Sequence, residues 1–243
     1  MAFSGSFFKK KLYADLSPLF TYKNLSGVLS KRGAHRMIGE WISSNYAVKL
    51  GRGLYAKTTS DAYYIASRGT GGYISFSSAL YVARLKNETE SQILVATPTK
   101  KKEIPLPGIR IVSVGMGEFF FGDKTVERSG LPLRVATYAK TLFDMCHRPK
   151  YADFYCMYRA MNWKPFSSKD WKELARYCAM APLSTRRRIG YIVDGKAPKG
   201  ILRKIESLNS EKGISFLYGK GGDYSAKWRI YDSEHVRRWI DEV

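Results

Sequence analysis

The sequence predicts an α+β fold, and three observations support that class. Apolar residues recur at helical spacing through the first 44 residues, two strand-like runs follow directly, and short strands and helices then occur without a fixed repeat. The chain has 243 residues, 44% of them hydrophobic and 26% charged, so it can bury a substantial core. This composition excludes a disordered tail, a collagen-like fibre and a low-complexity linker.

The first two predicted helices are short. Pro18 ends the first one because proline cannot continue a helix, and Thr21 is a suitable N-cap for the second. Along the first helix, apolar side chains recur at i, i+4 and i+8, at Phe8, Leu12 and Leu16. The second helix carries Leu25, Val28 and Leu29.

A third helix is predicted from residue 34 to about residue 44, after a turn over residues 30–33. Its apolar face holds Met37, Ile38, Trp41 and Ile42. Its opposite face holds His35, Arg36, Gly39, Glu40 and Ser43. Residues 47–56 are typical of two strands around the turn Gly51-Arg52-Gly53. Three short helices followed by a hairpin predict a winged helix-turn-helix domain over residues 1–60.

Residues 61–243 are expected to form a larger mixed α/β domain, with a sub-boundary near residue 146. Helices are predicted at 77–85 and 138–146, and strands at 93–96, 109–114, 119–121 and 133–135. Beyond residue 146 the pattern is mainly helical over 151–208. Two strands at 214–218 and 227–231, joined by the glycine-rich hairpin turn at 219–223, precede a last helix capped by Ser233.

Charge is the most unusual property of the sequence. It has 41 Lys+Arg against 21 Asp+Glu, a formal net charge of +20 and a pI near 9.8. The excess is most one-sided in residues 1–60, which hold 10 Lys+Arg and 2 Asp+Glu, whereas residues 146–243 hold 20 and 11. Such a chain repels itself unless a polyanion shares the charge, so nucleic acid is the first expected partner and an anionic membrane surface the second.

Cysteine usage and hydropathy favour a cytoplasmic protein. Cys146, Cys156 and Cys178 are odd in number and lack paired spacing, so no disulfide framework is expected and a reducing compartment fits. Near the start of the sequence the basic run follows the aromatic residues, which is the reverse of the order in a signal peptide. No window has the roughly 18 apolar residues of a membrane span. No membrane partner, cofactor or metal is predicted, since the histidines also lack ligand spacing.

The N-terminal block is the predicted DNA-binding site. In a helix-turn-helix the third helix enters the major groove, and Lys31, Arg32, His35 and Arg36 lie at its N-terminal end. Arginine suits the two acceptors of guanine, and Lys49 and Arg52 of the hairpin would reach phosphates or a minor groove. The second helix adds Thr21, whose helix start would hold a phosphate, and Lys23. Two alternatives stay open: a solvated basic face, and a winged helix that binds protein.

A second basic surface is predicted less specifically. Lys100, Lys101 and Lys102 follow a strand and precede a proline-rich turn, which is typical of an exposed loop. Arg186 and Arg187, with Arg188, open a helix whose other face is apolar, so at least one of them should point outward. Each group would contact nucleic acid or a protein partner, or would only be solvated.

The sequence shows no catalytic constellation. Neighbouring residues on a helix do not face one another, so Cys146 and His147 are expected as a core cysteine and a surface histidine rather than a nucleophile and its base. Three carboxylates, Asp144, Asp153 and Asp170, have a spacing that favours helix capping and surface roles over a nuclease magnesium site. The chain is therefore predicted not to be an enzyme.

Several motifs, in order along nearly the whole chain, resemble the AbiEi-type antitoxins of prokaryotic type IV toxin–antitoxin systems. The matching residues are 20–25 (FTYKNL), 50–55 (LGRGLY), 72–75 (GYIS), 78–80 (SAL), 136–144 (ATYAKTLFD), 187–192 (RRIGYI) and 227–229 (KWR). Two positions differ: Val82-Ala83-Arg84 stands where the family has His-Gly, and Ala139 where it has Glu.

The resemblance implies a winged-helix DNA-binding domain joined to a larger α/β domain. It implies a transcriptional regulator that represses its own operon by binding its promoter and counters a nucleotidyltransferase-type toxin. It places DNA contact on Arg52, and it has Tyr55 packing the wing onto the helices. Two other classes compete with this interpretation: a nucleic-acid-processing enzyme that uses the winged helix to bind its substrate, and an interaction module whose basic second domain binds an acidic partner.

Overall fold

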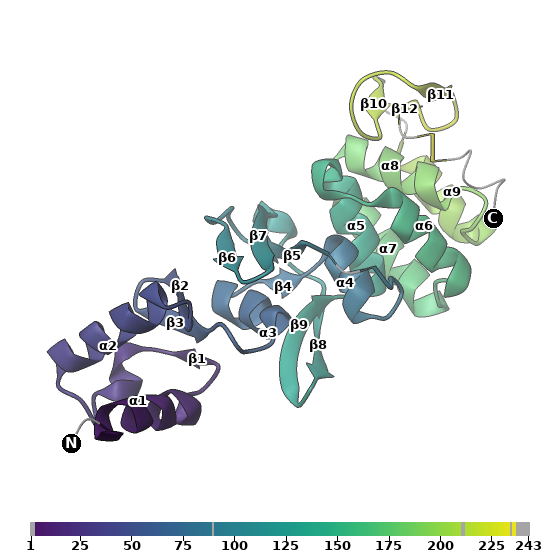
Figure 1. Ribbon diagram of the computed structural model, residues 1–243. Helices are drawn as coiled ribbons and strands as arrows, with labels where there is room; N and C mark the ends of the chain where they lie inside the picture. Colours follow the sequence, from purple (N-terminus) through teal and green to yellow (C-terminus); the bar gives the residue numbers. More distant parts are fainter. Residues whose placement is uncertain (1–2, 89, 210–211, 234, 237–243) are drawn as a thin grey trace. The chain divides into compact units, whose positions relative to one another are not determined.

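The computed structural model describes residues 3–88, 90–209, 212–233 and 235–236 (Figure 1). These residues form a mixed α+β protein with three β-sheets, so the predicted class is confirmed. Among the described residues, no helix combines the length and apolar character that crossing a membrane requires.

The chain divides into two compact units. The first contains residues 1–73, 90–118 and 126–134, and the second contains residues 74–89, 119–125 and 135–243. The first unit therefore continues past residue 60, where the sequence predicts a domain boundary, because two later segments of the chain return to it.

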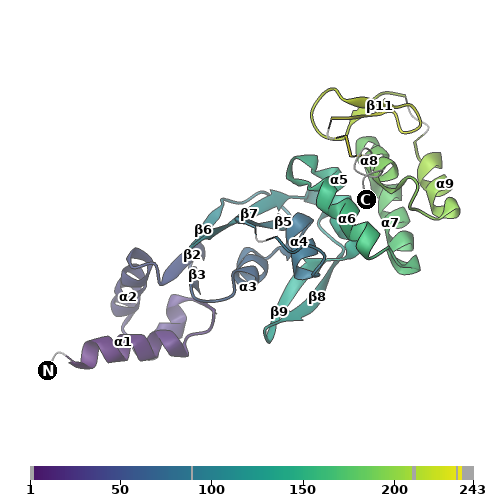
Figure 2. The same ribbon diagram turned by 45° about the vertical axis from the view of Figure 1, so that its right-hand side comes forward.

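The first sixty residues of the first unit form helices around a small sheet. Helix α1 (Phe3–Asp15), strand β1 (Leu19–Phe20) and the 3-10 helix η1 (Tyr22–Leu25) precede α2 (Lys31–Ser43), which is followed by the hairpin of β2 (Ala47–Gly51) and β3 (Leu54–Lys57). Strand β1 pairs antiparallel with β3, so the order of this sheet is β1-β3-β2. Figure 2 shows the β2–β3 hairpin next to α2. The Lys57 ammonium donates to the carbonyls of Ala14 and Leu16, at 3.1 and 2.8 Å, and so joins β3 to the end of α1.

One apolar cluster holds these elements together. Partly buried side chains of Leu12, Tyr13, Tyr22 and Leu29 surround it. Its buried members come from every element between α1 and β3 and are Leu16, Phe20, Leu25, Ala34, Met37, Ile38, Trp41, Ala47 and Tyr55. The predicted apolar face of the third helix is thus confirmed for Met37, Ile38 and Trp41, whereas Ile42 is 37% exposed.

Two local predictions here are wrong. The second helix is a single 3-10 turn that ends at Leu25, so Val28 is exposed rather than part of a helical stripe. The predicted turn over 30–33 is the first turn of α2, because the Ser30 hydroxyl accepts the Gly33 N–H at 3.2 Å and caps the helix. Strand β1, which is only two residues long, was not predicted.

The rest of the first unit adds strands and two short helical turns. These turns are α3 (Ala62–Tyr64) and the π-helical η2 (Ile65–Gly69). Strand β5 (Gln92–Thr97) pairs parallel with β7 (Ile109–Gly115), and β6 (Ile104–Leu106) pairs antiparallel with β7. The predicted strands at 93–96 and 109–114 are confirmed, and β6 was missed.

These strands belong to a six-stranded sheet. Its other members are β4 (Tyr73–Ile74), β8 (Asp123–Arg128) and β9 (Leu131–Ala136), and its order is β6-β7-β5-β4-β9-β8. Strands β4 and β9 pair parallel, with Ile74 opposite Val135. The expected strand at 119–121 does not form, since residues 117–119 are the 3-10 turn η3 (Gly117–Phe119).

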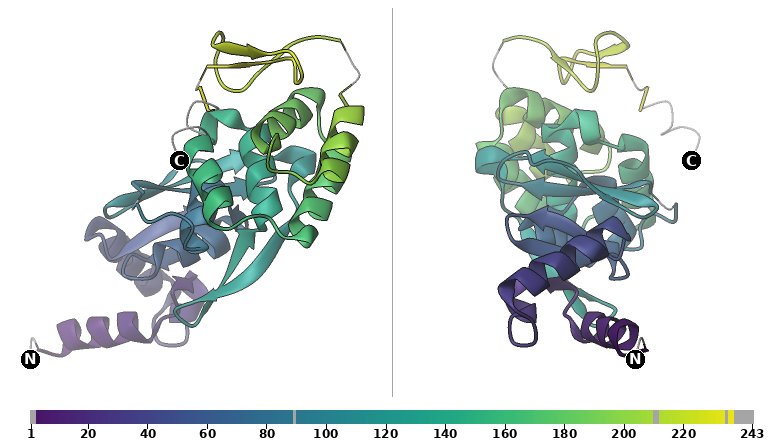
Figure 3. Two further views of the ribbon diagram at one scale, coloured as in Figure 1. Left: turned by 90° about the vertical axis from the view of Figure 1, so that its right-hand side faces the viewer. Right: turned by 60° about the vertical axis from the view of Figure 1, so that its left-hand side comes forward.

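The second unit is mainly helical. Its helices are α4 (Phe76–Val82), α5 (Tyr138–His147), α6 (Phe154–Trp163), α7 (Ser168–Met180), α8 (Leu183–Val193) and α9 (Lys199–Ser207), with a 3-10 turn η4 (Pro149–Tyr151). Helix α5 is almost entirely buried and contacts α4, α7 and α8. Figure 3 shows this helical group with the last sheet beside α8.

The last sheet differs from the predicted hairpin. Strand β10 (Ser215–Phe216) pairs parallel with β12 (Ile230–Asp232), and β11 (Asp223–Ser225) pairs antiparallel with β12, so β12 lies in the middle. The glycine-rich segment 219–222 therefore joins two strands that are not neighbours. The helix predicted after Ser233 falls largely outside the described residues.

Candidate nucleic-acid interface

Helix α2 separates apolar from basic side chains. Met37, Ile38 and Trp41 are buried in the first unit, which fixes the rotation of the helix about its axis. Four residues of this helix are predicted to contact DNA, and all four are exposed: Lys31, Arg32, His35 and Arg36. They lie in its first two turns, so the structure brings this part of the predicted site together.

The acidic residue Glu40, on the exposed face of α2, forms an ion pair with a lysine of α1. Glu40 accepts a hydrogen bond from Lys9 of α1, with Nζ 2.7 Å from Oε2. This bond, together with the Lys9 charge and the weaker influence of Arg36, holds the pKa of the Glu40 carboxyl below its usual range. Glu40 is consequently ionised and neutralised by Lys9, and the start of α2 keeps its positive charge.

The η1 turn contributes an aromatic contact that sequence reasoning missed. The ring of Tyr22 stacks on His35, with centroids 5.3 Å apart and planes 24° apart, and this contact limits the orientations of the imidazole. A tyrosine just before a basic helix carries no signal of such stacking in the sequence alone. Lys23 on the same turn is exposed.

Thr21 does not take the role predicted for it. Its backbone N–H and its hydroxyl both donate to the Asn24 side-chain oxygen, at 2.7 and 2.9 Å. The turn that follows has only four residues, so it lacks the helix dipole on which a phosphate site at a helix start depends. Thr21 therefore shapes the chain here and offers no phosphate site.

The β2–β3 hairpin presents two more predicted residues. Lys49 and Arg52 are both exposed, and Gly53 has φ of 73°, a conformation that permits the tight turn after Arg52. Tyr55 is buried and stacks on Phe20 of β1, with centroids 5.8 Å apart, and it belongs to the apolar cluster that contains Met37 and Trp41 of α2.

A hollow of about 650 Å³ lies between α1 and the end of α2. The sequence did not predict it, because its walls come from two separate stretches of the chain, residues 9–13 and 40–46. Three aromatic side chains line it, and Tyr13 meets both Trp41 and Tyr46 edge to face, with centroids 5.4 and 5.7 Å apart. Lys9, Lys10, Glu40 and Ser44 complete the lining.

The lysine loop at 100–102 also belongs to the first unit and is exposed. Its middle residue is held in place, since the Lys101 ammonium donates to the Thr70 carbonyl and the Lys101 N–H donates to the Ser113 hydroxyl at 2.6 Å. Lys100 and Lys102 flank it. The loop leads into β6, which contacts β2 of the hairpin.

The second pair of predicted surface residues does not form a basic surface. Arg187 is 1% exposed, and its guanidinium donates to the Gly213 carbonyl at 2.7 Å. Arg186 donates to the carbonyls of Ala181 and Leu208. These arginines satisfy backbone oxygens of segments that pack on α8, which a local reading of the sequence could not foresee.

A buried ion pair explains the ATYAKTLFD motif. The Lys140 ammonium contacts the Asp144 carboxylate one turn later and donates to the Phe119 carbonyl at 2.9 Å, and the Ser75 hydroxyl donates to Asp144 at 2.6 Å. Lys140 and Asp144 are fully buried. Desolvation lowers the pKa of Lys140, while the Asp144 charge opposes that shift. With no access to solvent, this network supports structure rather than catalysis.

The other residues of the second unit that were considered for catalysis or metal binding have structural roles. Burial raises the pKa of the Cys146 thiol, and burial lowers the pKa of His147 to about 4, so the pair cannot act as thiolate and base. Asp153 caps α6, and Asp170 forms a capping box with Ser167 at the start of α7. Within the described part of the chain, no three His, Cys, Asp or Glu side chains gather as metal ligands would.

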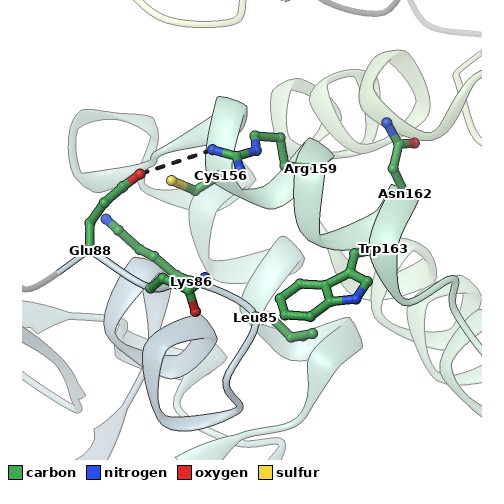
Figure 4. Close-up of a pocket in the computed structure, with 8 residues that line it drawn as sticks. Leu85, Lys86, Glu88, Cys156, Arg159, Asn162 and Trp163 are labelled. Atoms are coloured by element: carbon green, nitrogen blue, oxygen red, sulfur yellow. Dashed lines mark ion pairs between the residues drawn. The ribbon is translucent and has the colours of Figure 1, made fainter. Parts of the chain in front are cut away.

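A hollow of about 380 Å³ in the second unit contains an ion pair between Arg159 and Glu88, whose atoms are 4.0 Å apart (Figure 4). Cys156 and Trp163 also line it. The pKa of the Cys156 thiol is raised to about 12 by burial and then by its hydrogen bond with Asp153, so this thiol is unreactive at neutral pH.

Comparisons with known proteins support the fold. No protein-family model and no curated protein matches the chain. The chain is similar to the crystal structure of the Rv2827c protein from Mycobacterium tuberculosis, with a TM-score of 0.65 and 15% sequence identity over 97% of this chain and 94% of that one. At this identity the similarity shows a shared fold across almost the whole of both chains.

Proposed function

We propose that residues 1–60 form a winged helix-turn-helix that binds double-stranded DNA, and that the protein is a cytoplasmic transcriptional regulator. The observation that carries the proposal is the separation of faces on α2. One face is locked into the core by Met37, Ile38 and Trp41, and the first two turns of the other expose three cationic side chains and His35. An α-helix of this kind fits the major groove.

The proposed contacts divide into two kinds. Arg32 and Arg36 present paired N–H donors that match the O6 and N7 acceptors of guanine, and Lys31 and His35 lie beside them. Lys23, Lys49 and Arg52 are exposed on η1 and the hairpin and would contact phosphates, which fix the register of the protein on the duplex. Thr21 is left out of this set because its polar groups already bond to Asn24.

The regulatory role rests on the resemblance to AbiEi-type antitoxins. That resemblance supports repression of the chain's own operon and a functional link to a nucleotidyltransferase-type toxin. The structure adds a physical reason for two of the shared motifs, since Lys140 and Asp144 form a buried pair and Gly190 lies against Trp228. A nucleotidyltransferase gene immediately downstream would support the antitoxin assignment.

The test is a binding titration of the full chain against its own upstream region and against a shuffled duplex of equal length, over a series of salt concentrations. We expect Arg36→Ala to lose discrimination between the two duplexes by about 5- to 150-fold, because a bidentate base contact is worth about 1–3 kcal/mol. Lys49→Ala should weaken both duplexes alike and flatten the salt slope by about one.

Lys124→Ala, an exposed lysine of β8, is the matched control and should change neither quantity. Equal affinity of the wild-type chain for its own upstream region and the shuffled duplex would refute sequence-specific regulation.

A further inference from the structure

The last sheet carries a row of aromatic side chains across all three of its strands. Tyr231 on the central strand β12 lies opposite Phe216 of β10 and opposite Tyr224 of β11. Residues directly opposite on neighbouring strands point to the same face, so the three rings form one line across the sheet. Phe216 stacks on Tyr231 with centroids 5.7 Å apart and planes 17° apart, and the centroids of Tyr224 and Tyr231 are 4.9 Å apart.

The opposite face of this sheet is fixed to helix α8. Asp232 is buried and accepts the Tyr191 hydroxyl at 2.7 Å, and Ile230 is fully buried. Arg188 donates to the Phe216 carbonyl at 2.6 Å and so holds β10 against the helix. Because the inner face is bonded in this way, the aromatic row is a rigid outer surface rather than part of the core.

The outer face is partly accessible, since Phe216 and Tyr231 are half-buried and Tyr224 is exposed. Tyr224 is 49% exposed and Tyr218 is 44% exposed. Tyr218 also borders a hollow of about 370 Å³, whose lining includes Tyr155, Lys150 and Asp153. A space of that size holds one aromatic base, since pockets for small ligands begin near 300 Å³.

The rim of this surface is mainly basic. Lys212, Lys220 and Arg229 are exposed on the segments that lead into and connect the strands, and Lys150 is exposed at the hollow. Lys220 stands among three glycines in the segment 219–222, whose backbone can approach a ligand closely. Among the described residues here, Asp153 lines the hollow, and Asp223 lies opposite the buried Asp232, on the inner face, and pairs with His235 at 3.0 Å.

We propose that the outer face of the β10-β12-β11 sheet binds single-stranded nucleic acid. Successive bases would stack on the row of Phe216, Tyr231 and Tyr224, with the phosphates near Lys220 and Arg229 and one base in the hollow beside Tyr218. Stacking on open rings requires unpaired bases, which excludes duplex as the occupant.

This proposal is independent of duplex binding by the first unit, and the experiment measures single-strand binding and duplex binding separately. Labelled 12-nucleotide oligouridine, oligothymidine and a 12-base-pair duplex are titrated with the full chain in fluorescence anisotropy. We expect oligouridine and oligothymidine both to bind. Tyr224→Ala should weaken oligouridine about 5- to 150-fold, the equivalent of about 1–3 kcal/mol for one stacked base, and leave the duplex unchanged.

Three further variants separate stacking from folding and from charge. Tyr224→Phe keeps the ring and should bind oligouridine as the wild type does, whereas Lys220→Ala should flatten the salt slope by about 0.7. Trp163→Ala removes an exposed aromatic side chain elsewhere in the second unit and should have no effect. Arg36→Ala should change duplex binding alone.

Two results would overturn the proposal outright: no binding of oligouridine, or equal binding by Tyr224→Ala and the wild type.

Discussion

Basic residues of similar sequence context have opposite environments in this protein. Arg36 follows an exposed histidine on α2 and is itself exposed, whereas Arg187 lies within a run of three arginines and is 1% exposed. Arginine tolerates burial when its fixed fork of donors meets carbonyl oxygens, and Arg187 finds one at Gly213. Counting charges along the chain therefore overestimates the charge available to a ligand.

His147 shows how burial changes an ionisable group. It contacts the rings of Phe119 and Phe143, with centroids 4.5 and 5.9 Å away, and its Nδ1 is 3.3 Å from the Thr185 hydroxyl. Desolvation first, and then the charges of Arg148, Lys140 and Arg188, lower its pKa from 6.5 to about 4. The imidazole is thus neutral in the folded protein at neutral pH.

This shift makes stability depend on pH. Between pH 6.5 and 4 the unfolded chain binds a proton at His147 that the folded protein does not, so the free energy of unfolding decreases as pH falls through this window. Because the ring is partly accessible, we expect His147 to account for about 1–2 kcal/mol of that decrease. Urea unfolding at several pH values should show a shallower decrease for His147→Gln. Parallel curves for the two proteins would contradict the assignment.

At the scale of elements, the close packing of helix α8 on Trp228, which lies between β11 and β12, depends on one glycine. The backbone of Gly190 lies so close to Trp228 that an added Cβ would be 2.0 Å from Cζ3 of the indole. Trp228 is 1% exposed, and its indole N–H donates to Asp194 at 2.9 Å. A glycine at position 190 is therefore a packing requirement.

Gly190→Ala should separate α8 from Trp228. We expect a loss of about 1–3 kcal/mol in the free energy of unfolding, the usual cost of overpacking a filled core. The matched control is Gly200→Ala in α9, where an added Cβ has nothing within 4 Å and the higher helix propensity of alanine adds up to about 1 kcal/mol. Chemical denaturation of both variants tests this, and equal stability of the two would refute the packing argument.

Capping decided where α2 begins. The sequence predicts a turn over residues 30–33, yet the Ser30 hydroxyl accepts the Gly33 N–H and the helix starts at Lys31. Consequently Lys31 and Arg32 lie on the first turn of α2 itself. They belong to the same rigid element as His35 and Arg36, which strengthens the proposed groove contact.

At the scale of the whole molecule, the charge of +20 should destabilise the fold by self-repulsion. Salt screens such repulsion between exposed groups. We expect the thermal midpoint to rise by about 2–4 °C between 50 and 300 mM sodium chloride, which corresponds to about 1 kcal/mol in a chain of this size. Scanning fluorimetry measures it, and a midpoint that falls with salt would contradict the expectation.

A charge-reversal variant serves as the control for this effect. Lys124, Lys169 and Lys172 are exposed, and changing all three to glutamate removes repulsion without removing core contacts. The rise with salt should be smaller in this variant than in the wild type. An equal rise would show that salt acts through something other than net charge.

The sequence by itself determined those features that depend on neighbouring residues. Apolar spacing predicted the α+β class and the buried face of α2, and the Gly-Arg-Gly turn predicted the hairpin. The exposed positions of His35, Arg36, Lys49 and Arg52 followed from the same pattern, because a helix or hairpin with one buried side leaves the other in solvent. Lys31 and Arg32 were expected in the turn before the helix, and only the structure places them on α2.

Only the tertiary structure decided features that depend on distant partners. It buried Arg187 and paired Lys140 with Asp144, it placed Tyr22 on His35, and it turned the supposed hairpin at 219–223 into a three-stranded sheet with an aromatic row. The physical reason is that burial of a charge or stacking of a ring depends on which segments meet in space. The spacing of residues along the chain carries no information about these contacts between distant segments.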